Sequence, residues 1–431
     1  MNFSSTDSAG NALPAASGSA LVPAQAAPVS PAGPLAAITP AGPHESAKAR
    51  LAAAVDAARD EIVELSHRIH AHPEPAYEEV QAATWIAAIL RERGFAVEHP
   101  AGSLATAIRA TMRGGQAAPG PRIGILAEYD ALPGLGHGCG HNTMAASGVG
   151  AAIALATLID ELPGEIVFLG TPAEERGSGK MTMIEDGLFD GIDAALLFHP
   201  CDRSHVESQP LASEDVDVVF HGLQAHAAAD PWRGRNALDA MILLFSSVGL
   251  WRQQLRTDAR VHGIIQEGGT AANIIPDRTR AWFMLRSPEQ TYYEEMKTRF
   301  GALVDAAALA TGTTAEVTFS GGAMTMKQSR TLESRWVANA AAYGIVDQGP
   351  DPNSGSTDMG NVSWVCPTIH PELAIAPEGT AGHSILFRDA AATPAADATT
   401  LLAATLVAQT AYELFADPEL VAAAWRDFNA N

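Results

Sequence analysis

The 431-residue chain has few cysteines, few basic residues and no long apolar run. Its three cysteines, Cys139, Cys201 and Cys366, are too few and odd in number for a disulfide framework. No stretch reaches the ~18 consecutive apolar residues of a membrane-spanning helix. With 27 basic against 49 acidic residues, the net charge of −22 argues against nucleic acid or an anionic membrane as a partner. These absences favour a soluble protein of a reducing compartment, so we expect a cytoplasmic location.

Residues 1–44 lack lysine and arginine and contain one acid, Asp7. Alanine, proline, serine and glycine dominate this segment. Because it has neither a basic start nor a dense apolar stretch, it does not resemble a secretory signal. The composition predicts a low-complexity, disordered tail without chemistry of its own.

The remaining chain predicts an α/β fold interrupted by an inserted unit. In residues 45–212 apolar strands, such as 123–127, alternate with helical patterns, such as 45–65 and 142–159. Asn142 or Thr143 is expected to cap the second of these helices. This alternation indicates a mostly parallel sheet flanked by helices. The pattern of residues 213–322 instead predicts half-buried strands and two helices. Over residues 323–431 strand and helix patterns alternate again. We therefore predict a catalytic domain from residues 45–212 and 323–431, with an inserted α+β domain at 213–322.

Potential metal ligands follow the predicted strands. The segment Gly136–Asn142 places a thiol and an imidazole two residues apart, so both can reach one cation. Acidic residues and a further histidine follow the next strands, where open α/β sheets place their ligands. The predicted ligands are Cys139, His141, Glu175, His199 and His383.

Five donors exceed the four of a closed structural zinc site and favour two divalent cations that share one donor. Such a pair can activate water and polarise a substrate carbonyl. Zinc or manganese fits these donors best, and nickel or cobalt is also compatible. Glu174 and Glu175 are adjacent, so in an extended segment their side chains point in different directions. Glu175 can then bind a metal while Glu174 faces the water as the predicted general base. The alternatives are a solvated acidic pair and a nucleophilic Cys139, although no Cys-His-Asn arrangement supports the latter.

Together these motifs resemble the M20 metallopeptidase and amidohydrolase family, in its aminoacylase-like branch. The residues that carry the resemblance are Glu128–Pro133, the Gly134–Asn142 run, Thr171–Glu175 and the late His383, in this order. Residues 127–134 and 355–363 are most similar to the aminobenzoyl-glutamate hydrolase subgroup. The resemblance implies the same five ligands, Glu174 as the base, and an inserted lid domain that forms a homodimer.

The resemblance also implies roles for residues that no pattern alone assigns. His226 would stabilise the oxyanion, often from the partner subunit, and Asn273 would lie near the substrate, both as hydrogen-bond donors. Asp130 is expected to orient a metal ligand. Arg176 could bind a substrate carboxylate or only balance nearby acids.

The expected activity is metal-dependent, carboxypeptidase-like hydrolysis of a small-molecule amide. The substrate class is an N-acyl or N-aroyl amino acid, such as an aminobenzoyl-glutamate-like compound, or a dipeptide. The alternatives are hydrolysis of an auxin-like aromatic conjugate and a non-catalytic metal-binding dimer.

Overall fold

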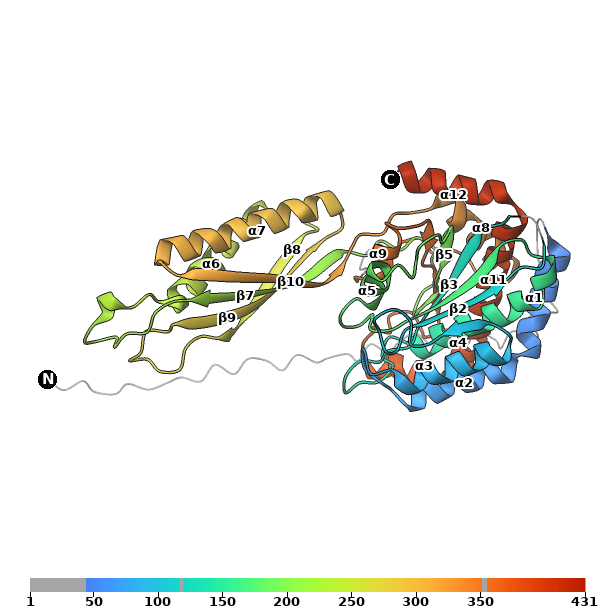
Figure 1. Cartoon of the computed structure of the whole chain (residues 1–431), viewed down its shortest axis with the longest axis horizontal. Helices are drawn as coiled ribbons and strands as arrows, with labels where there is room; N and C mark the ends of the chain where they lie inside the picture. Colours follow the sequence, from blue (N-terminus) through green and yellow to red (C-terminus); the bar gives the residue numbers. More distant parts are fainter. Residues whose placement is uncertain (1–43, 117–118, 351–354, 431) are drawn as a thin grey trace, which may run out of the picture.

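The computed structural model describes residues 44–116, 119–350 and 355–430, so the tail expectation lies outside the described residues except for His44. Figure 1 shows a larger body of helices around a sheet and a smaller, elongated body beside it. The chain passes into the smaller body once, near residue 212, and returns near residue 323. Using the names from the sequence prediction, we call the larger body the catalytic domain and the smaller one the lid.

The catalytic domain is built on a six-stranded sheet of order β1-β2-β4-β3-β5-β11. Its strands are β1 (Ala96–Glu98), β2 (Ile108–Arg113), β3 (Arg122–Glu128), β4 (Glu165–Thr171), β5 (Ala194–Leu196) and β11 (Thr368–Ile369). The central pairs β3–β4, β3–β5 and β5–β11 are parallel, which confirms the predicted α/β class. The pairs β1–β2 and β2–β4 are antiparallel. The short connection between β1 and β2 leaves no room for a crossover helix.

Helices surround this sheet. They are α1 (Glu45–Ala57), α2 (Arg59–Ala71), α3 (Val80–Glu92), α4 (His141–Ala156), α5 (Gly179–Glu185), α8 (Arg330–Ala342), α9 (Met359–Val362), α10 (Ile385–Ala390), α11 (Pro394–Ala416) and α12 (Pro418–Ala430). A two-stranded parallel ribbon, β6 (His199–Cys201) with β12 (Glu372–Ala374), completes the domain.

Helix α4 is the central helix of the catalytic domain. It packs on β3 and β4, and α2 and α11 contact it as well. Every residue from His141 to Leu155 is buried, which explains why its sequence is apolar all round. A Cβ at Gly148 would lie 2.9 Å from the carbonyl oxygen of Leu126, so glycine permits this close approach to the sheet.

Two local predictions were wrong. The helix expected over residues 45–65 is two helices, with a break at Ala58. Helix α4 begins at His141, and Asn142 does not cap it. The side-chain amide of Asn142 instead donates to Ser66 Oγ and to the carbonyl of Ala391, so it ties α4 to two distant segments.

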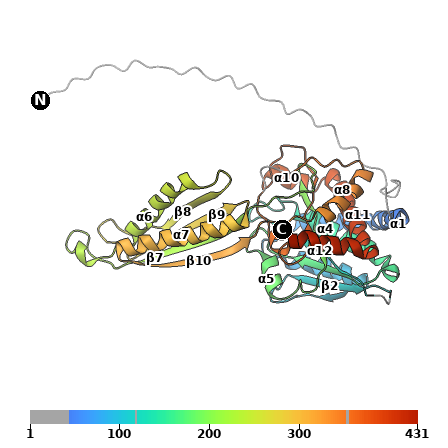
Figure 2. The same cartoon turned by 90° about the horizontal axis from the view of Figure 1, so that it is seen from above.

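The lid is a four-stranded antiparallel sheet of order β10-β7-β9-β8 with two helices. Its elements are β7 (Ala212–His221), α6 (Ala237–Trp251), β8 (Arg260–Glu267), β9 (Arg278–Ser287), α7 (Gln290–Thr311) and β10 (Thr314–Ala323). Figure 2 shows α6 and β8 along one long side of the lid, with α7 and β10 toward the other. Aromatic contacts such as Phe283 with Phe300, 5.1 Å between ring centroids, join the sheet to its helices.

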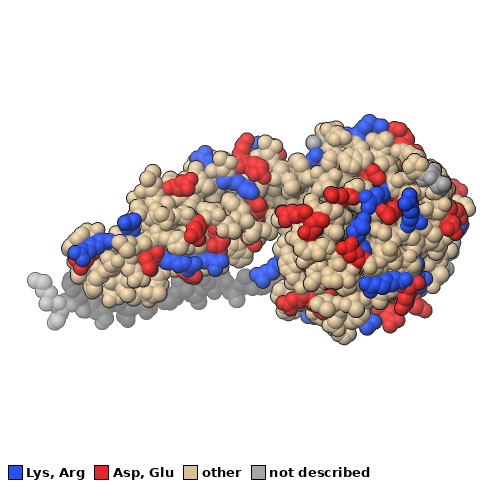
Figure 3. Space-filling model, in the orientation of Figure 1, with Lys and Arg blue, Asp and Glu red and all other residues tan. Residues whose placement is uncertain are grey.

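Acidic and basic side chains are interspersed on the face of the molecule in Figure 3, over both domains. None of the described helices is both long enough and apolar enough to cross a membrane.

Candidate metal centre

The thiol and the imidazole of the Cys-Gly-His segment lie between β3 and α4. Gly140 adopts a φ of 78°, and a Cβ there would lie 2.8 Å from Pro200. This left-handed turn requires glycine and allows Cys139 and His141 to face the same side. His141 is fully buried at the first turn of α4.

The structure brings the five predicted ligands together as two triads of donors. Within each triad the donor atoms lie within 4.8 Å of one another. One triad is Cys139, His141 and His199, and the other is Cys139, Glu175 and His383. Because Cys139 belongs to both triads, its thiolate can bridge two neighbouring cations.

The contacts within the triads fit a metal pair. Cys139 Sγ lies 3.5 Å from His199 Nε2, and His383 Nε2 lies 3.4 Å from Glu175 Oε2. The buried atom Glu175 Oε1 has no hydrogen-bond partner among the described residues, and His141 Nε2 has only an ion-pair contact, with Glu128 Oε2 at 3.2 Å. Buried polar atoms are rarely left in this state, so the donor set fits two bound cations.

Asp130 lies behind two of these ligands, where the resemblance placed it. Its Oδ1 is 2.9 Å from His141 Nδ1, and its Oδ2 accepts the backbone N–H of Glu175 at 2.9 Å. A proton on Nδ1 leaves the Nε2 lone pair of His141 directed at the centre. Asp130 therefore orients the His141 imidazole of one triad and the backbone of Glu175, a ligand of the other triad.

Glu174 lies next to the metal ligands without belonging to either triad. Its carboxylate forms a third group with His141 and Glu128, with donor atoms within 4.8 Å of one another. Burial, followed by the neighbouring carboxylates Glu128, Asp358 and Glu175, raises the pKa of Glu174 well above its usual range. A carboxyl group that holds a proton this readily suits general acid–base work.

The carboxylate of Glu128, in the third group, is paired with the ammonium group of a buried lysine. Lys180 Nζ lies 2.5 Å from Glu128 Oε1 and 2.5 Å from Asp358 Oδ1, and all three side chains are buried. Burial lowers the pKa of Lys180, but Asp358 and Glu128 outweigh burial and raise it. The motif-based prediction did not include this lysine, although it follows Glu174–Glu175 in a Gly-Ser-Gly-Lys run.

A buried acid supports the loop that carries Glu174. Glu79 accepts the backbone N–H of Ala173 at 2.8 Å, and Ala173 has a φ of 60°. Burial raises the pKa of Glu79 from 4.5 to about 7, although the hydrogen bonds that it accepts oppose this shift. The folded state therefore favours the protonated acid, and this stability is lost as the pH rises from 4.5 through about 7.

Between pH 4.5 and 7.5, wild-type protein should lose up to about 3 kcal/mol more unfolding free energy than Glu79→Gln, which cannot ionise. Urea unfolding of both proteins at the two pH values measures this difference. Glu78→Gln, at the exposed neighbouring position, is the matched control and should follow wild type. Parallel pH profiles for wild type and Glu79→Gln would contradict the assignment.

The metal centre opens into a cleft of about 760 Å³ between the two domains. This volume is in the range typical of small-molecule sites. The catalytic domain contributes the two glutamates and Cys139, His199 and His383, while the lid contributes Ser213, Asp215, Met284 and Arg286. Arg176 and Arg286 are the cationic side chains that line it. Arg176 is exposed, as a substrate-binding or charge-balancing residue would be.

Two lining residues were missed from sequence. The ring of His370 lies 5.3 Å from that of His199, between centroids, and its buried ring nitrogens have no hydrogen-bond partner among the described residues. Arg286 lies on β9 of the lid and lines the cleft from that side. No local motif marks either residue, because each is positioned by its strand pairing.

The structure does not bring His226 and Asn273 to this cleft. They adjoin each other in the lid, where Ala227 N donates to the carbonyl of Asn273 at 3.0 Å. His226 follows β7 at His221 and Asn273 precedes β9 at Arg278, so both adjoin this end of the lid sheet, whereas the cleft lies at the other end, near Ala212 and Ser287. Ten-residue strands separate the two ends by about 30 Å. His226 Nδ1 accepts two backbone N–H groups, which leaves Nε2–H available as a donor.

Comparison with known proteins is consistent with this geometry. Residues 124–404 match peptidase family M20/M25/M40. The chain is 37% identical over 407 residues to the Xaa-Arg dipeptidase of Mus musculus, covering 89% of this chain and 92% of that protein. It is 33% identical over 312 residues to one of the subunits of the p-aminobenzoyl-glutamate hydrolase of Escherichia coli, covering 68% of this chain and 64% of that subunit.

Among solved structures, the fold is similar to that of the YXEP protein of Bacillus subtilis, a dinuclear metal-binding peptidase of the M20 family. The TM-score is 0.62 at 22% identity, covering 81% of this chain and 98% of that chain. The chain is therefore a hydrolytic enzyme that belongs to peptidase family M20/M25/M40.

Proposed function

We propose that this enzyme hydrolyses the amide bond of an N-acyl or N-aroyl amino acid, or of a dipeptide, whose carboxylate is free. The observation that carries the proposal is the Cys139 thiol shared by two ligand triads, with Glu174 beside them. Two bound divalent cations, zinc or manganese, would polarise the substrate carbonyl and lower the pKa of water. Because a thiolate ligand persists best under reducing conditions, we place the enzyme in the cytoplasm.

Glu174 takes the proton from the attacking water and returns it to the leaving amine. Its raised pKa makes Glu174 a stronger base for the first step. Nearby, the Lys180 ammonium pairs with the carboxylates of Glu128 and Asp358. A substrate carboxylate would pair with Arg176 or Arg286, the two guanidinium groups at the cleft. The raised pKa of Glu174 supports its role as the base, and the positions of Arg176 and Arg286 at the cleft support a role in binding the carboxylate.

A second candidate substrate is a dipeptide that ends in a basic residue. Asp215 lines the cleft from β7, and its buried Oδ1 has no hydrogen-bond partner among the described residues. A carboxylate in this position can pair with a guanidinium or ammonium group. The similarity to a protein named Xaa-Arg dipeptidase supports the same substrate class.

The experiment is a panel of N-acyl and N-aroyl amino acids and dipeptides, assayed by amine release with metal-loaded enzyme. We expect turnover of substrates with a free carboxylate and loss of turnover when that carboxylate is amidated. If dipeptides ending in arginine are preferred, Asp215→Asn should remove the preference and spare aromatic acyl glutamates. A metal-loaded protein that is inert on the whole panel would contradict the proposed substrate class.

We further propose that the enzyme is a homodimer formed through the lid. Strand β8 is one of the two edge strands of the lid sheet, and its Ile264 and Ile265 are exposed. Helix α6, on the same side, exposes Ile242, Leu243 and Leu250. An apolar surface beside an unpaired strand edge favours association of two copies.

In such a dimer His226 and Asn273 would act in the partner's cleft, since they lie about 30 Å from their own. Glu174→Gln and His226→Ala should each be nearly inactive alone, the second by about 10²–10³-fold. Co-expressed, they should regain about a quarter of wild-type activity, because each mixed dimer of the two-fold assembly has one intact site. Activity no higher than that of the separate variants would show that His226 does not act across subunits.

A further inference from the structure

A second set of metal-binding side chains lies next to the cleft. Cys201 ends β6, His205 follows four residues later, and Glu372 begins β12. Their sulfur, nitrogen and oxygen donor atoms all lie within 4.8 Å of one another. None of the three belongs to the triads around Cys139, and no sequence motif assigns them a role.

Backbone pairing holds these donors in place. Strands β6 and β12 are parallel, with Cys201 opposite Ala374. His205 and Glu372 exchange both backbone hydrogen bonds, at 3.0 and 2.8 Å. Sites built on paired strands are more rigid than sites on free loops. The three donors are therefore pre-organised by the fold.

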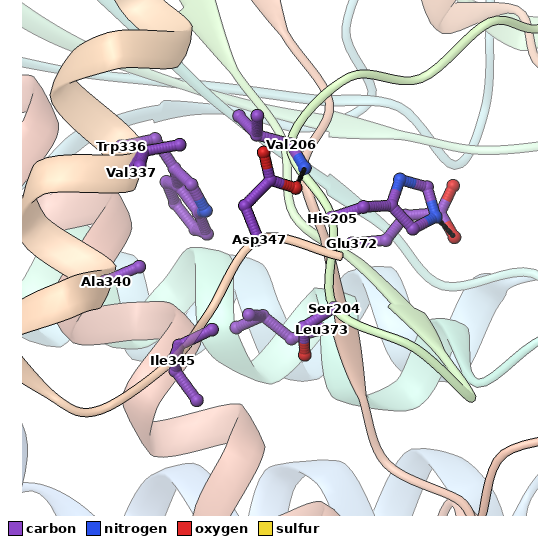
Figure 4. A pocket seen from close by; sticks show the side chains of 10 residues that line it. All are labelled: Ser204, His205, Val206, Trp336, Val337, Ala340, Ile345, Asp347, Glu372 and Leu373. Carbon is purple, nitrogen blue, oxygen red and sulfur yellow. Dashed lines mark hydrogen bonds and ion pairs between the residues drawn. The ribbon is translucent and has the colours of Figure 1, made fainter. Parts of the chain in front are cut away.

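The hydrogen bonding of His205 favours a cation here. Its Nδ1 lies 3.2 Å from the carbonyl oxygen of Glu207, which can only accept, so Nδ1 carries the proton. Its Nε2 lies 3.3 Å from Glu372 Oε2, a contact visible in Figure 4. An imidazole lone pair and a carboxylate attract each other only through a proton or a metal ion between them. Metal-binding histidines show the same arrangement of one ring nitrogen on a carbonyl.

We propose that Cys201, His205 and Glu372 form a third divalent-cation site, distinct from the pair at Cys139. Thiolate, imidazole and carboxylate donors together suit zinc, cobalt or cadmium rather than magnesium or calcium. Cys201 and Glu372 also line the cleft. His205 and Glu372 border a small neighbouring cavity as well, and Figure 4 shows the His205 ring lying beside Glu372, away from Trp336 and Ile345. The fourth coordination position would therefore face the cleft.

The test is metal analysis of full-length protein equilibrated with a small excess of Zn²⁺ and passed over a desalting column. Wild type should retain three ions per chain, and Cys201→Ala and His205→Ala should each retain two. Cys366→Ala, which removes the other thiol outside the triads, should retain three. Two ions in wild type and in Cys201→Ala would overturn the third site while leaving the proposed hydrolase intact. No retained ion would contradict both proposals.

A second measurement does not depend on the folding of a variant. Alkylation of Cys201 by iodoacetamide, followed by mass spectrometry of the wild-type peptide, should slow at least tenfold when the third equivalent of Cd²⁺ is added. An unchanged rate would mean that His205 and Glu372 form only a proton-bridged ion pair.

Discussion

Replacing Glu174 with glutamine should lower kcat by about 10²–10⁴-fold and leave the metal content unchanged. The amide keeps the shape of the side chain but cannot take a proton from water or return it to the leaving amine. Metal binding should persist, because Glu174 belongs to neither triad around Cys139. Steady-state kinetics on the best substrate of the panel, with metal analysis of the same preparation, measures both quantities.

Glu175→Gln is the matched comparison at the adjacent position. Glu175 belongs to a triad, so this variant should lose a metal ion together with activity. The pair separates a proton-transfer role from a ligand role. Near-normal turnover in Glu174→Gln would contradict the assignment of the base.

Replacing Cys139 with alanine should remove two bound ions per chain relative to wild type and abolish activity. Its sulfur is the one donor common to both triads, so its loss weakens both sites at once. Loss of a residue that only orients a ligand costs about 10–100-fold in metal affinity, and loss of a shared ligand should cost more. Isothermal titration with Zn²⁺ after chelator treatment measures the affinities.

His383→Ala gives the contrasting result. Because His383 contributes to one triad only, this variant should lose one ion and keep the other. Its side chain is 57% exposed, so the substitution should leave the fold intact. Equal metal content in Cys139→Ala and wild type would show that the thiol does not bridge.

Features set by local pattern were predictable from sequence. The apolar run Ile123–Leu126 forms β3, a strand buried on both faces, and the acids after it lie at the carboxyl edge of the sheet. The Cys-Gly-His segment and Glu174–Glu175 follow neighbouring parallel strands, so their convergence follows from the αβ alternation.

Features that depend on pairing between distant segments were not predictable in this way. Lys180 meets Asp358, 178 positions away, and Asn142 meets Ala391, 249 positions away. The Cys201–His205–Glu372 cluster exists because β6 pairs with β12. Local periodicity also gave no indication of the break at Ala58, where neither proline nor glycine interrupts the helical pattern.

The most direct test of the central claim is a crystal structure of the zinc-loaded protein with anomalous data at the zinc edge. It should show two ions about 3.5–4 Å apart, the spacing of a two-metal hydrolytic site, with Cys139 Sγ bound to both. A single ion at this position, or two ions that do not share Cys139, would contradict the account.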